Sequence, residues 1–232
     1  MNQGYMIAVE GTDKAGKHTQ VMKIINYLKS QNIAAQTLDF PQYNSFFGQV
    51  ITNYLNGKYG ATRNLPAEYT MMPYALDRLQ HQTKLRDWLN AGNWVILDRY
   101  TYSNSFSVAK MPRGQWPEKI KFMEEMEFNQ LGLIRPDHNI FLYLKPQIAF
   151  NMRNHGLKKY QNGNADIHER DLDLLTNVVD VYKYIAQQNP GNWTVIDEMK
   201  SDGERMGVNQ VFDNIRPIID KLINDKTKMR VR

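Results

Sequence analysis

The chain of 232 residues contains no cysteine, which excludes disulfide bonds, thiolate zinc sites and cysteine nucleophiles. It also lacks any apolar run close to the about 18 to 20 residues that a membrane helix requires. The first residues, 1–9, have neither the basic flank nor the cleavable apolar core of a secretion signal. The five histidines include no pair at the spacing of metal ligands. We therefore expect a soluble, cytoplasmic protein.

What the sequence does have is a globular composition, with 42% hydrophobic and 23% charged residues. This length and composition suit one domain, because domains of roughly 100 to 250 residues bury a core of their own. Lys and Arg number 29 against 24 Asp and Glu, a net charge of +5, which suits a phosphate-bearing partner but does not by itself indicate nucleic-acid binding. We expect a single domain over residues 1–225 and a flexible basic tail over 226–232.

Short apolar runs alternate along the chain with longer helical patterns, which is typical of a parallel α/β sheet. The runs of strand length lie at 5–9, 34–40, 94–97, 139–144 and 193–196. The helical patterns occupy 17–30, 69–91, 118–131, 171–188 and 207–224. This order predicts an α/β fold in which helices flank a parallel sheet.

A phosphate-binding loop follows the first predicted strand. Residues 10–20 have the sequence EGTDKAGKHTQ, in which Gly11, Gly16 and Lys17 show the G-x-x-x-x-G-K spacing between a strand and a helix. The glycines let backbone N–H groups converge on a β-phosphate, and the amino end of the helix adds partial positive charge. Lys17 would neutralise the β- and γ-phosphates of a nucleotide. The predicted phosphate contacts are Gly11, Lys14, Ala15, Gly16, Lys17, His18 and Thr19.

One position departs from the usual loop. The residue after the lysine, normally a Ser or Thr whose hydroxyl binds Mg²⁺, is His18. Imidazole suits Mg²⁺ poorly, because this ion prefers hard oxygen ligands. Three alternatives follow: a water held by Asp98 or His18 takes the position, Thr19 reaches the metal after a slight shift of the helix, or catalysis is weak or absent.

Several motifs in a fixed order resemble those of thymidylate kinases, in the nucleoside monophosphate kinase superfamily of P-loop proteins. They are the loop at 10–17, Phe40-Pro41, Tyr74 with Arg78, Asp98-Arg99-Tyr100, GLIRPD at 132–137, YQNG at 160–163 and the run at 193–197. The resemblance spans roughly residues 4–220. It implies a five-stranded parallel sheet with a short lid, a homodimer, and transfer of the γ-phosphoryl group of ATP, with Mg²⁺, to dTMP.

The resemblance also assigns catalytic roles. Asp98 follows a predicted strand, where ligands bind in open α/β sheets, and would hold a metal-bound water. Arg99 is similar to the family arginine that reaches between donor and acceptor phosphates; a structural Asp98–Arg99 salt bridge is the alternative. Asp13 matches the aspartate that contacts the acceptor 3′-hydroxyl and this arginine. Lys14 stands where one branch of the family has an arginine that acts on the transferring phosphoryl group. Thr19 is the second candidate for holding the metal, after Asp98.

The acceptor site is predicted from residues outside the phosphate-binding loop. Tyr74 and Arg78 are four residues apart on a predicted helix, so one can stack on a pyrimidine while the other donates to a base carbonyl; a core Tyr74 and a solvated Arg78 are the alternative. Phe40 and Pro41 would wall the pocket. The resemblance further implies Ser103 and Asn104 at the thymine edge, and Phe106 or Ser107 as the position whose aromatic ring excludes a ribose 2′-hydroxyl.

The segment 153–166 resembles the lid that closes over the phosphates of this family and excludes water. Arg153, Lys158 and Lys159 are its candidate contacts with ATP, and Tyr160 matches a lid tyrosine that faces the acceptor.

A second departure concerns the acceptor phosphate. Gln42 and Tyr43 follow Pro41 where relatives usually carry an arginine. Tyr43 offers a neutral hydrogen bond, so Arg99 would carry most of the phosphate recognition. Two alternative functions stay open at this point: a kinase of another or a modified pyrimidine monophosphate such as dUMP, and a nucleotide-binding homologue with impaired catalysis.

Overall fold

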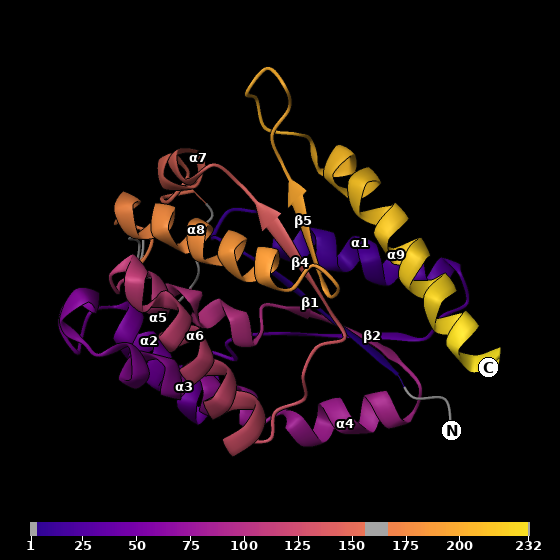
Figure 1. Ribbon diagram of the computed structural model, residues 1–232, viewed down its shortest axis with the longest axis horizontal. Helices are drawn as coiled ribbons and strands as arrows, with labels where there is room; N and C mark the ends of the chain where they lie inside the picture. Colours follow the sequence, from indigo (N-terminus) through magenta and orange to yellow (C-terminus); the bar gives the residue numbers. More distant parts are fainter. Residues whose placement is uncertain (1–3, 156–166, 232) are drawn as a thin grey trace.

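The computed structural model describes residues 4–155 and 167–231. In this part of the chain, five parallel strands form one sheet with helices on both faces (Figure 1). The sheet has the order β2-β3-β1-β4-β5. Its strands are β1 (Tyr5–Gly11), β2 (Ala35–Asp39), β3 (Trp94–Asp98), β4 (His138–Tyr143) and β5 (Trp193–Asp197). The predicted α/β fold with a five-stranded parallel sheet is confirmed.

The alternation of side chains along β1 divides the core into two halves. Met6 and Ala8 pack into a cluster on one face, whereas Ile7 and Val9 pack into a second cluster on the other, because successive side chains of a strand point to opposite faces. Both faces are covered, so the central strands are apolar almost without interruption, as expected for a parallel sheet.

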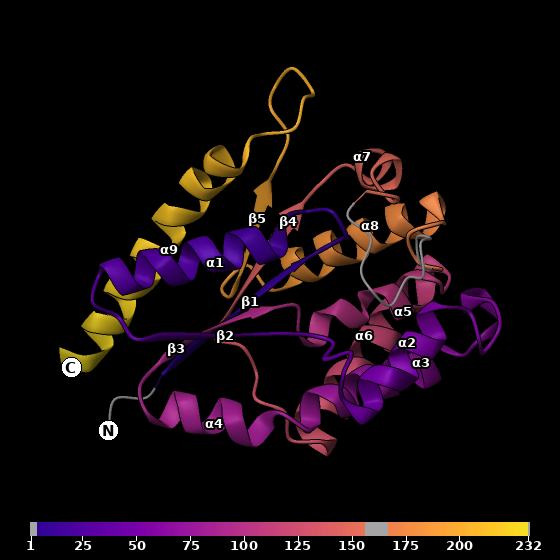
Figure 2. The same cartoon turned by 180° about the vertical axis from the view of Figure 1, so that it is seen from behind.

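Helices of the first cluster carry the acceptor side of the molecule, and helices of the second carry the phosphate loop. The first set is α3 (Ala67–Leu79), α4 (Gln82–Asn90), α5 (Ser105–Ala109), α6 (Trp116–Glu124) and α8 (Leu172–Gln188). The second set is α1 (Lys17–Ser30) and α9 (Val208–Val231), which lie side by side on the other face of the sheet (Figure 2). Short helical turns lie at η1 (Thr62–Asn64), η2 (Thr101–Asn104), η3 (Arg113–Gln115) and η4 (Glu125–Gln130).

The prediction of one continuous helix at 69–91 is wrong. The structure has α3 and α4 instead, with a break at Gln80 and His81. At the break the carbonyl of Arg78 accepts from the His81 N–H at 3.1 Å and from the Gln82 side-chain amide at 3.2 Å. These two donors satisfy a carbonyl that a continuous helix would have bonded to the N–H of Gln82. The pattern at 118–131 begins earlier, at Trp116, and continues from α6 into the π-helical turn η4.

Two helices have no counterpart in the sequence prediction, α2 (Phe46–Leu55) and α7 (Pro146–Asn151). The glycine and β-branched residues of α2 give it a weak helical signal. Gly48 is required there by packing, because a Cβ atom at this position would lie 1.9 Å from the carbonyl oxygen of Gln42. The Ser45 hydroxyl accepts from the Gly48 N–H at 2.9 Å and caps the helix. Helix α2 is thus pressed directly against the segment that follows β2.

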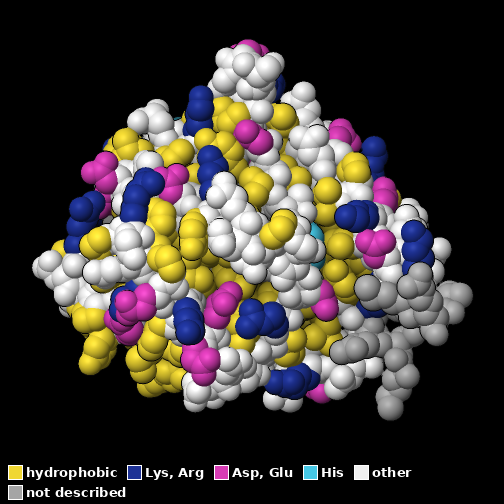
Figure 3. Space-filling view, viewed as in Figure 1, with side chains coloured by type: hydrophobic (Ala, Val, Ile, Leu, Met, Phe, Trp, Pro, Cys, Tyr) yellow, Lys and Arg dark blue, Asp and Glu magenta, His cyan; other side chains and the backbone are white. Residues whose placement is uncertain are grey.

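Several hydrophobic side chains remain exposed on α3 and α6, where Figure 3 shows apolar atoms gathered at the lower left of the molecule. They are Tyr69, Met72, Leu79 and Phe122, and Tyr69 is 71% exposed. No helix in the described residues is both long and apolar enough to span a membrane.

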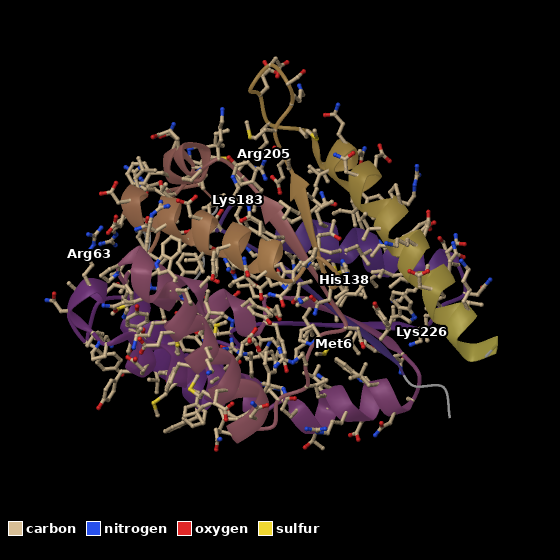
Figure 4. The ribbon with its side chains drawn as sticks, in the orientation of Figure 1. Met6, Arg63, His138, Lys183, Arg205 and Lys226 are labelled. Atoms are coloured by element: carbon tan, nitrogen blue, oxygen red, sulfur yellow. The ribbon has the colours of Figure 1, made fainter. Side chains whose placement is uncertain are left out.

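The basic segment expected to be a flexible tail continues helix α9 as far as Val231. Lys226, labelled in Figure 4, contacts the start of the sheet. Its ammonium nitrogen lies 5.3 Å from the ring centroid of Tyr5 and 5.7 Å from that of Trp94, distances typical of cation–π attraction. The last turns of α9 are therefore held against the start of β1. Most of the predicted lid, residues 156–166, lies outside the described residues.

Candidate active site

A cleft of about 750 Å³ opens at the carboxyl edge of the sheet. Register places its walls together, since Asp98 of β3 is level with Val9 of β1 and with Asp39 of β2. The cleft is large enough for a nucleotide. It is lined by Asp13, Lys14, Gly16, Lys17, His18, Thr19, Asp39, Phe40, Pro41, Tyr43, Asn44, Gln49, Thr52, Asn53, Asp98 and Arg99.

The phosphate loop forms one end of this cleft. Gly16 has φ 70° and precedes α1, so a residue with free access to the left-handed region makes the turn into the helix. The first turn of α1 has no side-chain cap and no acidic residue, which leaves its positive end to an anionic ligand. The Lys17 ammonium is buried and donates to the Thr12 carbonyl at 2.8 Å.

Arg99 lies against the phosphate loop and lines the cleft. Its guanidinium donates to the Gly11 carbonyl at 3.0 Å and to Asp13 Oδ1 at 2.8 Å. Burial alone would lower the pKa of Arg99, but the negative charge of Asp13 raises it above the ordinary value, so the group stays charged. The structure thus brings together the two residues that the sequence paired by resemblance. It pairs Arg99 with Asp13 and gives no Asp98–Arg99 salt bridge in the described residues.

Asp98 lies at the cleft beside His18, with 3.8 Å between Oδ2 and the imidazole Nδ1. Thr19 also lines the cleft. No cluster of three or more His, Asp or Glu side chains that could hold a metal exists within residues 4–155 and 167–231. One carboxylate at the edge of a phosphate site fits Mg²⁺ carried in by a nucleotide, because this ion keeps several waters and binds few protein groups.

A second, inner pocket adjoins the cleft and has a volume of about 40 Å³. A cavity needs about 10 to 15 Å³ of such volume to hold one water molecule, so this pocket has room for a few waters and its walls would have to move to admit a pyrimidine ring. It brings together all the predicted acceptor residues of the described chain and adds two others. The lining is Asp13, Phe40, Pro41, Tyr43, Leu55, Tyr74, Arg78, Arg99, Ser103, Asn104, Phe106, Ser107 and His168.

Arg78 is held in place by a partner that sequence reasoning missed. It is 1% exposed, and its guanidinium donates to both oxygens of Glu127, at 2.6 and 2.7 Å, and to the Tyr100 carbonyl at 3.2 Å. The alternative of a solvated Arg78 is therefore wrong. Tyr74 is half-buried and meets Tyr54 edge to face, with 6.4 Å between ring centroids.

Ser103 and Asn104 use their hydrogens on buried carboxylates. The Ser103 hydroxyl donates to Glu10 Oε2 at 2.6 Å, and the Asn104 amide donates to Glu127 Oε1 at 2.7 Å. Their oxygen atoms are then the groups that can accept a hydrogen bond from a ligand N–H. Both side chains line the inner pocket, which suits the ring N–H of thymine or uracil.

His168 forms a wall of the inner pocket that the sequence did not suggest. Its ring stacks on Phe106, with centroids 5.0 Å apart, and its Nε2 lies 2.9 Å from the Tyr54 hydroxyl. Burial lowers the pKa of His168 to about 4, so the imidazole is neutral at pH 7. Ser107, the other candidate for the sugar position, accepts from the Thr70 hydroxyl at 2.8 Å. Both Phe106 and Ser107 reach the pocket, so the assignment between them stays a prediction.

The lid residues give a different result. Arg153 turns back onto its own helix, donating to the Phe150 carbonyl at 2.8 Å with its guanidinium 4.0 Å from the Phe150 ring. It is not among the residues that line the cleft. Lys158, Lys159 and Tyr160 lie outside the described residues.

Comparison with known proteins agrees with this arrangement. The family model for thymidylate kinase matches residues 9–206. The thymidylate kinase of Mycobacterium tuberculosis strain H37Rv is 31% identical over 196 residues, covering 82% of this chain and 90% of the relative. The human thymidylate kinase is 25% identical over 227 residues, covering 97% and 94%. The solved structure of the Candida albicans thymidylate kinase has the same fold, with a TM-score of 0.73, 21% identity, and coverage of 96% and 93%.

The buried imidazole of His168 predicts a pH dependence of stability. Its pKa falls from an ordinary 6.5 to about 4 in the folded protein, so the unfolded chain binds the extra proton and stability is lost as the pH falls below 6.5. Between pH 7.5 and 5 the free energy of unfolding should fall by about 2 kcal/mol more in the parent protein than in His168→Gln. Urea denaturation measures this, with exposed His155→Gln as control. Equal declines in the parent and His168→Gln would contradict the burial argument.

Proposed function

The chain belongs to the thymidylate kinase family and is a kinase that phosphorylates dTMP with ATP; we propose that it performs this transfer where the large cleft meets the inner pocket. The donor triphosphate lies on the phosphate loop in the cleft, and the acceptor base lies in the inner pocket. The alternatives of a different pyrimidine monophosphate and of a catalytically impaired homologue are not favoured by the relatives. Function as a nucleotide kinase agrees with the modest positive charge, and the cytoplasmic location stays a prediction.

The observation that supports this proposal best is the position of Arg99. Together with Asp13, Phe40, Pro41 and Tyr43 it lines both the cleft and the inner pocket. A donor phosphate on the loop and an acceptor phosphate at the mouth of the inner pocket would therefore both face one buried guanidinium. Such a group stabilises the charge that spreads over the transferring phosphoryl group.

The chain supplies position and charge rather than covalent chemistry. Lys17 and the first turn of α1 would bind the β- and γ-phosphates, and Lys14 would approach the transferring group from the crest of the loop. Asp13 would accept from the 3′-hydroxyl of the acceptor while it orients Arg99. Mg²⁺ bound with ATP would reduce the charge of the phosphates, with Asp98 and Thr19 as the protein groups nearest its expected place. Transfer follows from alignment, since the transition state is loose.

Recognition of the acceptor phosphate is mainly neutral on the side of α2. Asp77 fixes this wall by accepting from the Gln42 N–H at 2.9 Å and from the Ser45 hydroxyl at 2.7 Å. Tyr43 then faces both the cleft and the inner pocket. We propose that Tyr43 donates one neutral hydrogen bond to the phosphate and that Arg99 supplies the charge.

The family pattern and the exposed apolar side chains of α3 and α6 support a homodimer. Tyr69, Met72, Leu79 and Phe122 would lose contact with water in such an assembly.

Removing either central cation should abolish most activity. We expect Lys17→Ala and Arg99→Ala each to lower kcat by about a hundredfold or more. Each substitution removes a positive charge that stabilises the transition state more than the bound substrates. Lys23→Ala, which removes a contact between α1 and Asn209 of α9 and lies outside the lining of the cleft, should keep normal turnover. Coupled ADP-release assays measure these rates, and near-normal kcat in either cation variant would refute the assigned roles.

The acceptor is tested by a panel of nucleoside monophosphates. We expect turnover with dTMP and close analogues, and low turnover with cytidine and adenosine monophosphates, because Ser103 and Asn104 present acceptors to a ring N–H that cytosine and adenine lack. The panel is run with Mg²⁺ and with Mn²⁺. Faster turnover with Mn²⁺ that is lost in His18→Ala would assign His18 to the metal, since Mg²⁺ prefers hard oxygen ligands. Finding dTMP to be a minor substrate would overturn the proposal.

Charge placed on the apolar surface should separate the dimer. We expect light scattering to give twice the chain mass for the parent and a monomer for the double variant Tyr69→Glu, Met72→Glu. Val208→Glu, at an exposed apolar residue on α9, should leave the dimer intact. A monomeric parent protein at micromolar concentration would refute the assembly.

A further inference from the structure

The crest of the phosphate loop has a backbone conformation that its own residue does not favour. Lys14 has φ 66°, in the left-handed region, although it has a Cβ atom. Such a conformation costs free energy for a residue other than glycine, and it persists only where neighbouring groups hold it. The structure shows which group does so.

Arg205 reaches the loop from the segment that follows the edge strand β5. It lies in the hairpin between β5 and α9, where Met199 and Arg205 form an antiparallel bridge and the Met206 N–H donates to the Glu198 carbonyl at 2.7 Å. Figure 4 labels Arg205 above the carboxyl edge of the sheet, at the foot of the projecting hairpin. Its guanidinium Nη2 donates to the Lys14 carbonyl at 2.8 Å.

A buried carboxylate holds the guanidinium in this position. Glu198 is 1% exposed, and its Oε2 accepts from Arg205 Nε at 3.0 Å and lies 2.8 Å from Nη2. Nη2 carries two hydrogens, so it can serve Glu198 and the Lys14 carbonyl at once. A lysine has no rigid fork that could join both acceptors in this geometry.

The same pair lies against the working part of the loop. Burial raises the pKa of the Glu198 carboxyl to about 7, and the positive charges of Arg205 and Lys17 oppose this rise. A Cβ atom on Gly16 would lie 3.6 Å from Arg205 Nη2. The guanidinium is therefore packed beneath the loop that carries Lys14, Gly16 and Lys17, yet it is not among the residues that line the cleft.

The side chain of Lys14 is held separately from its backbone. Its ammonium lies 3.4 Å from Glu169 Oε1, and Glu169 is 5% exposed. An ammonium can move from Glu169 to a phosphate while the backbone stays fixed, provided that the carbonyl remains bonded to Arg205.

We propose that Arg205, secured by Glu198, is a positioning residue for phosphoryl transfer, which acts by holding Lys14 in the left-handed conformation that aims the loop at the transferring group. This inference rests on the proposed function for its kinetic readout. Arg205 is not among the residues that line the cleft; it acts through the Lys14 carbonyl.

The test is a double-mutant cycle between Arg205→Gln and Lys14→Gly. Glycine adopts the left-handed region freely, so the loop of Lys14→Gly no longer needs the bond from Arg205. We expect Arg205→Gln to lower kcat about tenfold in the parent, with the KM for dTMP changed less than about twofold. In the Lys14→Gly background the same substitution should cost less than about twofold. Arg205→Lys should fail to rescue kcat.

The matched control is Lys200→Gln, which removes the exposed Lys200–Glu204 ion pair of the same hairpin and should leave kcat unchanged. Equal losses from Arg205→Gln in both backgrounds, or an equal loss in Lys200→Gln, would overturn the inference. A second readout, the affinity for ADP measured by calorimetry, separates this inference from the proposed function. If the parent fails to turn over dTMP, the same four proteins of the double-mutant cycle are compared by their affinity for ADP. The same pattern of coupling then supports the positioning role, and additive effects refute it.

Discussion

The site depends on one buried carboxylate at the end of β1. Glu10 is fully buried and accepts from the Tyr100 N–H, the Ser103 hydroxyl and the Tyr182 hydroxyl, at 2.9, 2.6 and 3.0 Å. A carboxylate in this environment is tolerated only when donors surround it, so the segment after β3 and helix α8 are both drawn to β1. Arg99, the residue before Tyr100, takes the left-handed conformation that this bond requires and aims its guanidinium at the phosphate loop.

The charged groups around the cleft are arranged as pairs. Arg99 has Asp13, Lys14 has Glu169, Arg205 has Glu198, and Arg78 has Glu127 as carboxylate partner. Four cations in one region would repel one another and would cost much to bury, and the partners reduce both penalties.

The parts predicted well are those with local signals. The loop at 10–17 and helix α1 were found at the correct residues, because glycine spacing and a flanking strand belong to one short segment. The strands were found within two residues at each end, since buried parallel strands are apolar throughout. Helix α2 was missed because Gly48 weakens the helical pattern, and the need for Gly48 comes from contact with Gln42 rather than from the helix itself.

The parts that could not be predicted depend on contacts between distant segments. Arginine is a residue type suited to a contact with a base, so the sequence could suggest that role for Arg78. Its bonds to Glu127 join residues 49 positions apart, and no local pattern indicates them. His168 carries no motif, and it enters the pocket because Tyr54 and Phe106 fix its ring. The Asp13–Arg99 pair was expected from family resemblance. The Glu198–Arg205 pair belongs to no motif, and only the opposite charges of the two residues could have suggested it. An isolated charge in an apolar strand, as at Glu10, is the pattern that could have pointed to a structural carboxylate.

The small volume of the inner pocket has a consequence for how tightly the acceptor is held. If the acceptor base binds in this pocket, as proposed, it enters only those molecules whose pocket has opened, and the apparent dissociation constant equals the intrinsic one divided by the open fraction. Tyr74, Phe106 and His168 stabilise the closed form by packing on one another and on Tyr54. Part of the affinity for the base would then be set by how strongly these side chains pack on one another, in addition to their contacts with the ligand.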